Sequence, residues 1–175
     1  MQLPFQTKII AIGGGEISHP QNDNTGSSAS ETLFIDKEIF HLTNKPGAKL
    51  LFIPTASQDS KKYFERVKIY FTALGFASVD VLYVLDDTLT SKEIEDKILS
   101  HDAIYVGGGN TQKMLAISRQ LGIDRMLRHA LNRGVVLSGL SAGSICWFQG
   151  GFSRASITTN IDSRTEFVSA LDFID

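Results

Sequence analysis

The chain of 175 residues has a single cysteine, Cys146, and therefore cannot form an internal disulfide. One thiol among 4 histidines is too little for a structural zinc cluster, so the sequence predicts no metal site and no other cofactor. No apolar run approaches the roughly 18 residues that a membrane span needs. The start, MQLPFQTKIIAIGGG, also lacks a basic segment followed by a clean apolar one. We therefore expect a cytoplasmic protein that does not act at a membrane.

An excess of charge of either sign is absent too. The 17 Lys and Arg residues nearly balance the 19 Asp and Glu residues, which leaves a net charge of -2. A nucleic-acid-binding protein needs a basic stripe that displaces counterions from phosphates, so we expect no nucleic-acid partner. What the chain does have is 42% hydrophobic residues, and at this length a compact fold buries about 70% of the surface of the unfolded chain. The composition indicates one ordinary domain over residues 1–175.

Short apolar runs alternate with segments of helical periodicity. The apolar runs predict strands at 8–12, 50–53, 79–85, 103–106 and 135–137, whereas the polar stretch after Gly150 gives no clear element until Phe167. Helices are predicted between these strands, and the pairs Ser28–Glu31 and Thr90–Glu93 stand at capping-box spacing. The alternation predicts a three-layer α/β fold, a parallel sheet with helices on both faces, in which ligands bind at the carboxyl ends of the strands.

Residues 139–143 read Gly-Leu-Ser-Ala-Gly between a predicted strand and a predicted helix. This G-x-S-x-G pattern is typical of a nucleophile elbow, a sharp turn that exposes its middle side chain above the sheet. Ser141 is then the candidate nucleophile, and the N–H of Ala142 could stabilise an oxyanion. Gly108 or Gly109, at the end of another strand, is our candidate for the second donor. The alternative is a tight turn that carries no chemistry.

Four segments together resemble one known family. GGGNT at 107–111 and GLSAGSICWF at 139–148, with IPTAS at 53–57 and AIGGG at 11–15, are similar to the peptidase E family of serine peptidases, relatives of the cyanophycinases. The resemblance implies a class I glutamine amidotransferase-like (flavodoxin-like) fold, catalysis by Ser141 through an acyl-serine intermediate, and short peptide substrates with an N-terminal aspartate. Amidotransferases of this fold carry cysteine at the elbow, so the serine favours hydrolysis over ammonia transfer.

The resemblance also bears on the other members of a catalytic triad. Asp162, in TTNID at 158–162, matches the family's acid, although a loop carboxylate that caps a turn is an equal alternative. The family's histidine comes after a segment similar to 170–173, and no histidine follows Ser141 here. We therefore expect either that the peptidase domain lacks its C-terminal part or that it is a non-catalytic ligand-binding or interaction domain. His19, predicted at the same sheet edge as Ser141, is a remote alternative base.

Three further residues are candidates for substrate binding. Asn110 belongs to the GGGNT segment, and Arg154 and Arg164 lie in the polar stretch that follows the serine. Either arginine could pair with a substrate carboxylate, although a solvated arginine is the commoner case. Cys146 and Trp147 are expected to pack into the core. GGGEIS at 13–18 lacks the third glycine of a dinucleotide-binding loop.

Overall fold

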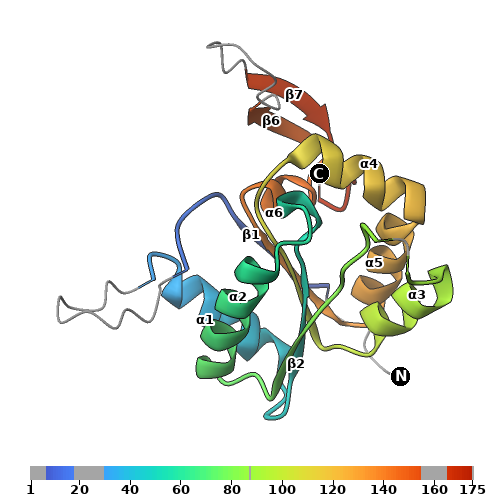
Figure 1. Ribbon diagram of the computed structural model, residues 1–175. Coiled ribbons are helices and arrows are strands. Elements are labelled where there is room, and N and C mark those ends of the chain that lie inside the picture. Colours follow the sequence, from blue (N-terminus) through green and yellow to red (C-terminus); the bar gives the residue numbers. More distant parts are fainter. Residues whose placement is uncertain (1–6, 18–29, 87, 155–164, 175) are drawn as a thin grey trace.

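A computed structural model describes residues 7–17, 30–86, 88–154 and 165–174 and contains a five-stranded parallel sheet between two layers of helices (Figure 1). The strands stand in the order β1-β5-β4-β2-β3, and every neighbouring pair is parallel. Their bounds are β1 Ile9–Ile12, β2 Lys49–Ile53, β3 Ser78–Val81, β4 Ala103–Val106 and β5 Val136–Leu140. The predicted α/β fold class is confirmed.

Helices cover both faces of this sheet. The helices are α1 Leu33–Thr43, α2 Lys61–Ala73, α3 Ser91–Leu99, α4 Thr111–Leu121, α5 Ile123–Asn132 and α6 Ala142–Ile145, with a short 3-10 turn, η1, at Thr55–Ser57. Helices α1 and α2 lie on one face, and α3, α4, α5 and α6 lie on the other (Figure 1). In a strand successive side chains point to opposite faces, so a central strand must be apolar at every position to serve both layers.

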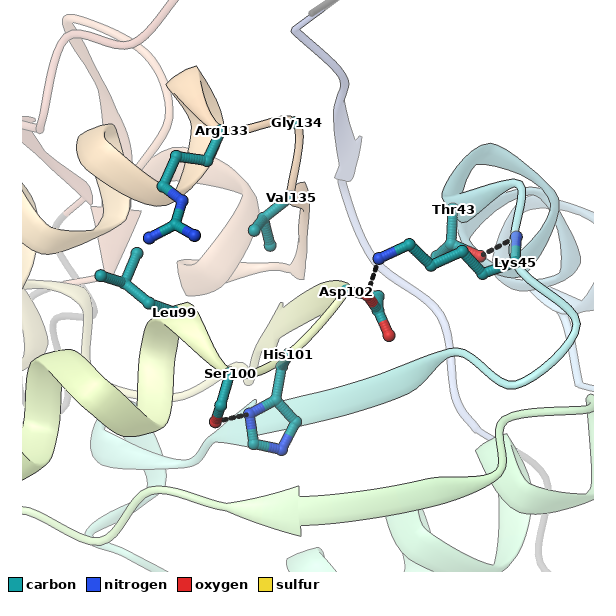
Figure 2. Close-up of a pocket in the computed structure, with 9 residues that line it drawn as sticks. All are labelled: Thr43, Lys45, Leu99, Ser100, His101, Asp102, Arg133, Gly134 and Val135. Carbon is teal, nitrogen blue, oxygen red and sulfur yellow. Dashed lines mark hydrogen bonds and ion pairs between the residues drawn. The ribbon is translucent and has the colours of Figure 1, made fainter.

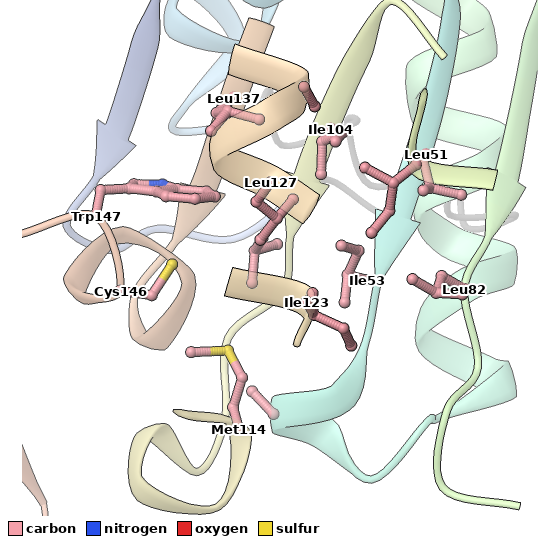
Figure 3. Close-up of a cluster of buried hydrophobic side chains, with 14 of the residues drawn as sticks. Leu51, Ile53, Leu82, Ile104, Met114, Ile123, Leu127, Leu137, Cys146 and Trp147 are labelled. Atoms are coloured by element: carbon pink, nitrogen blue, oxygen red, sulfur yellow. The ribbon is translucent and has the colours of Figure 1, made fainter. Parts of the chain in front are cut away.

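Strand β2 shows this division of the core. Leu50 and Phe52 pack in the cluster under α1 and α2, whereas Leu51 and Ile53 pack in the cluster under α3 to α6. Figure 3 shows the second cluster, in which Cys146 and Trp147 lie beside buried residues of the sheet and of α5. The expectation that Cys146 and Trp147 belong to the core is confirmed, because 2% and 0% of their surfaces are exposed.

Of the two predicted capping-box helix starts, the structure confirms the one at α3 and not the one at α1. Thr90 caps α3, accepting a hydrogen bond from the N–H of Glu93 while the Glu93 carboxylate accepts one from the N–H of Thr90, so this capping box is confirmed. The helix start predicted at Ser28–Glu31 is wrong, because α1 begins only at Leu33, with Thr32 at its N-cap position; Ser28 itself lies outside the described residues. The Glu31 carboxylate accepts a hydrogen bond from the N–H of Glu16 instead, a contact 15 residues away in sequence. The spacing of residues within the helix could not predict this contact with Glu16.

Two strand predictions need correction. The strand expected at 79–85 ends at Val81, and the amides of Val84 and Leu85 donate to the Asp59 carboxylate at 2.6 and 2.9 Å rather than to a neighbouring strand. The stretch after Gly150, where no element was predicted before Phe167, contains β6 Gly150–Arg154, which pairs antiparallel with β7 Thr165–Ser169. This hairpin projects beyond α4 at one end of the molecule (Figure 1).

The described residues contain neither a membrane-spanning helix nor a metal-binding cluster. None of the helices formed by these residues is long and apolar enough to cross a bilayer. Within the same ranges, no group of three or more His, Cys, Asp or Glu side chains is placed to hold a metal ion.

Candidate active site

Ser141 occupies the turn between β5 and α6. Its backbone has φ 54° and ψ -112°, a combination that residues with a Cβ atom rarely adopt. The turn is held from both sides, because the Ser141 N–H donates to the Ile12 carbonyl at 2.8 Å and the Ser141 carbonyl accepts from the amides of Ser144 and Ile145. The side chain is exposed, and its hydroxyl has no hydrogen-bond partner among the described residues. The fold thus presents a strained, accessible serine.

The two glycines of the G-x-S-x-G pattern are required by close backbone approach. A Cβ atom at Gly139 would lie 2.3 Å from the carbonyl oxygen of Gly143, and a Cβ atom at Gly143 would lie 2.1 Å from the carbonyl oxygen of Val106. Rotating a side chain cannot relieve either contact, because the atoms that the added Cβ would meet belong to the backbone. The glycines therefore allow α6 to start directly above β4 and β5.

The glycine loop after β4 meets this turn. A Cβ atom at Gly108 would lie 3.3 Å from the Cβ and 3.9 Å from the Oγ of Ser141. Gly109 faces away toward η1, where a Cβ atom would lie 2.1 Å from the carbonyl oxygen of Ala56. The N–H of Ala142, the first residue of α6, donates to no acceptor that the described chain provides. Of the predicted oxyanion donors, Gly108 and Ala142 adjoin Ser141, whereas Gly109 packs against Ala56.

Asn110 has a structural task in this loop. Its side-chain oxygen accepts a hydrogen bond of 2.9 Å from the N–H of Lys113 and so caps α4, while its own N–H donates to the Ala56 carbonyl at 2.8 Å. Asparagine is among the best N-cap residues because its side chain satisfies a helix amide that has no other partner. A role for Asn110 in substrate binding stays a prediction.

Tyr63 is a neighbour of the site that the sequence analysis did not single out. The first turn of α2 carries it to the carboxyl edge, where a Cβ atom at Gly107 would lie 3.0 Å from its Cε1. Burial raises the pKa of the Tyr63 phenol above its usual value of 10.0, while the nearby N–H of Gly108 opposes this rise. The only sequence signal was a hydroxyl-bearing aromatic residue at the start of a helix that follows a strand.

Most of the other polar residues predicted for the site either lie outside the described residues or lie far from Ser141. Asp162 and Arg164 lie outside the described residues, and so does His19. Arg154 ends β6, but only its backbone is described. The three other histidines lie at the amino edge, away from Ser141: two at the ends of helices that precede strands and one directly before β4, namely His41, His129 and His101.

A hollow of about 290 Å³ lies at that opposite edge and is not the candidate site. Figure 2 shows Lys45 reaching across it to Asp102, with which it forms an ion pair. The lining comes from the ends of α1, α3 and α5 and the chain entering β4 and β5: Thr43, Lys45, Leu99, Ser100, His101, Asp102, Arg133, Gly134 and Val135. Cations beside helix C-termini offset the carbonyls exposed there, which explains this surface without a ligand.

The fold and the turn together define a class: flavodoxin-like α/β proteins with an exposed serine between a central strand and a helix. Within that class, the sequence profile of peptidase family S51 matches residues 24–175. The uncharacterized peptidase YgaJ of Bacillus subtilis is 35% identical over 150 residues, which is 85% of this chain and 60% of that protein. Peptidase E of Streptomyces coelicolor is 33% identical over 98 residues, 56% of this chain and 37% of that one. The chain belongs to peptidase family S51.

Solved structures agree on the fold. A peptidase from an acI-B1 actinobacterium gives a TM-score of 0.67 at 19% identity, covering 99% of this chain and 68% of that one. A peptidase E candidate from Listeria monocytogenes gives a TM-score of 0.58 at 24% identity, covering 81% and 72%. The chain spans about 60% or less of the length of the curated relatives named above.

Proposed function

We propose that the chain provides the nucleophile and oxyanion hole of a serine peptidase that hydrolyses short peptides, with a preference for an N-terminal aspartate. The observation that carries the proposal is the position of Ser141, strained and exposed at a nucleophile elbow, directly beside Gly108. Strain of this kind costs about 1–3 kcal/mol and persists where the surrounding structure enforces it, commonly at functional sites. Membership of peptidase family S51 and relatives named as peptidases support the same activity.

The reaction would proceed through an ester on Ser141. The Ser141 Oγ attacks the carbonyl carbon of the scissile peptide bond and gives up its proton to a base, which passes the proton to the departing amine. Water then hydrolyses the ester and regenerates the serine. The N–H of Ala142, with an amide of Gly108 or Gly109, would stabilise the oxyanion of each tetrahedral intermediate.

The other roles in the proposal come from the sequence. His41, His101 and His129 lie at the amino edge, so the base is none of these three. His19 follows β1 in sequence and stays a candidate, with Asp162 as the acid that orients the base. Arg154 and Arg164 are proposed to pair with the carboxylate of an aspartyl substrate. The single cysteine fits a reducing compartment, so a cytoplasmic location is part of the proposal.

Dipeptide hydrolysis tests the proposal. We expect the protein to release aspartate from Asp-Leu faster than leucine from Leu-Leu, and Ser141→Ala to lower kcat/KM for Asp-Leu about 10³-fold or more with unchanged unfolding. Equal turnover by Ser141→Ala would contradict the role of Ser141. Binding of Asp-Leu without turnover by the unaltered protein would favour the alternative of a non-catalytic ligand-binding domain, which the placement of the three described histidines supports.

A further inference from the structure

The ring of Tyr63 packs between a strand and the glycine loop at the edge of the candidate site. It packs edge-to-face on Phe52 of β2, with ring centroids 4.9 Å apart and an interplanar angle of 75°. On another side it touches the glycine loop, as the 3.0 Å approach of a Cβ at Gly107 to Cε1 shows. The next residue of that loop, Gly108, adjoins Ser141. Tyr63 and Ser141 thus adjoin consecutive glycines of one loop, Gly107 and Gly108.

The hydroxyl of Tyr63 is suited to donate a proton in a hydrogen bond and unsuited to act as a base. Burial is the main cause that raises the pKa of the phenol, so the O–H stays intact near neutral pH. The nearby N–H of Gly108 favours negative charge on the phenol oxygen, which strengthens the O–H as a donor. Throughout the described part of the chain, no acceptor binds this O–H, although the Tyr63 N–H is bonded to the Ser60 side chain.

We propose that the Tyr63 O–H donates a hydrogen bond to the substrate's carbonyl oxygen as that oxygen becomes an oxyanion, with the Gly108 N–H bound behind it. This inference rests on the proposed serine peptidase activity and extends it. The oxyanion then has two donors of different kinds, the Ala142 N–H at the start of α6 and a phenol fixed by α2 and β2. In this arrangement Gly108 acts through Tyr63, so the phenol replaces the second backbone donor that the proposed function places at Gly108 or Gly109.

Tyr63→Phe removes the donor and keeps the ring, and Tyr83→Phe is a matched control. Tyr83 also packs edge-on against a phenylalanine, Phe64 of α2, with centroids 6.3 Å apart and an interplanar angle of 85°. The readouts are the second-order rate of Ser141 phosphonylation by a fluorophosphonate, and kcat and KM for p-nitrophenyl acetate. Removing one oxyanion donor typically lowers the rate about 10²–10³-fold.

The inference predicts that Tyr63→Phe phosphonylates about 100-fold more slowly and loses kcat with KM unchanged, while Tyr83→Phe matches the unaltered protein. Phosphonylation of Tyr63→Phe at the unaltered rate would overturn the role of Tyr63 and leave the proposed function standing. No phosphonylation of the unaltered protein would overturn the proposed function, and the role of Tyr63 with it.

A measurement without mutation at Tyr63 covers the case in which Tyr63→Phe fails to fold. A phenylboronic acid adduct on Ser141 mimics the tetrahedral intermediate, and ¹³C-labelled tyrosine reports each phenol carbon. The Tyr63 resonance, distinguished from the three others by single Tyr→Phe changes at 70, 83 and 105, should shift on adduct formation. An unmoved Tyr63 resonance beside a formed adduct would overturn the inference.

Discussion

Gly108 and Ser141 lie so close that a Cβ atom on the glycine would stand 3.3 Å from the Cβ of the serine. The contact follows from the pairing of β4 with β5, in which Val106, the last residue of β4, is opposite Gly139, one residue before the end of β5. Two loops of small residues can approach there, and the serine projects between them. This contact lies at the carboxyl edge of the sheet, where ligands bind in open α/β folds.

The strain at Ser141 can be measured. Ser141→Gly should raise the free energy of unfolding by about 1 kcal/mol over Ser141→Ala, because glycine adopts φ 54° without strain and alanine does not, less the entropy that glycine loses on folding. Urea denaturation of the two variants gives the difference. A less stable glycine variant would mean that the turn is not strained as its backbone angles imply.

Close approach at Gly139 and Gly143 predicts a stability loss for any added methyl group. Gly139→Ala and Gly143→Ala should each destabilise the fold by about 3 kcal/mol, because the new Cβ would meet backbone oxygens at 2.3 and 2.1 Å. Gly47→Ala is the control, since nothing lies within 4 Å of a Cβ at that position. Denaturation midpoints for the three variants check this, and equal midpoints would refute the packing argument.

Cys146 should be inert in the folded protein. Burial raises the pKa of its thiol far above the usual value, and only 2% of the residue is exposed, so little thiolate is present and reagents cannot reach it. We expect a disulfide reagent to modify Cys146 at least about 100 times more slowly in the folded protein than in guanidinium chloride. Rapid modification of the folded protein, with loss of hydrolysis, would point to a cysteine nucleophile instead of Ser141.

The buried carboxyl of Asp36 should make the free energy of unfolding depend on pH. Burial raises the pKa of this carboxyl from 3.8, even though Thr32 and Tyr70 donate hydrogen bonds to it at 2.6 and 2.8 Å. Because the folded-state pKa is the higher one, the stability that Asp36 contributes is complete below pH 3.8 and is lost as pH rises through the folded-state value. Each pKa unit by which the folded and unfolded states differ changes the free energy of unfolding by about 1.4 kcal/mol.

Asp36→Asn should remove this dependence. The unfolding free energy of the unaltered protein should fall relative to Asp36→Asn between pH 3 and pH 7, with the gap constant above the folded-state pKa. Asp96→Asn, at a carboxylate whose side chain is 61% exposed, controls for the general effect of losing a charge. A gap for Asp36→Asn that does not change with pH would show that the carboxyl titrates alike in both states.

The sequence predicted those features that depend on neighbours in the chain. Alternating apolar runs and helical stripes located all five strands of the sheet, and the capping pair Thr90–Glu93 located the start of α3. The missed features depend on residues far apart in sequence. Asp59 binds the amides of Val84 and Leu85 and so ends β3 early, and β6 forms only because β7 pairs with its glycine-containing run.

In the candidate site, too, local features could be predicted from the sequence, whereas contacts between distant segments could not. The pattern at 139–143 predicted the turn at Ser141 and the helix that starts at Ala142, because both are local structures. The neighbours of Gly108 and Gly109 could be known only from the fold, in which a Cβ at Gly108 would approach Ser141 and one at Gly109 would meet Ala56. Tyr63 was not predicted, because only the packing of α2 on β2 brings its hydroxyl end to the glycine loop.

The most direct test of the account is to locate the covalent adduct that a fluorophosphonate forms on the folded protein. Intact mass and peptide mapping should show one adduct per chain, on Ser141, and none on Ser141→Ala. An adduct on another residue, or none on the folded protein, would contradict the claim that the turn between β5 and α6 carries the nucleophile.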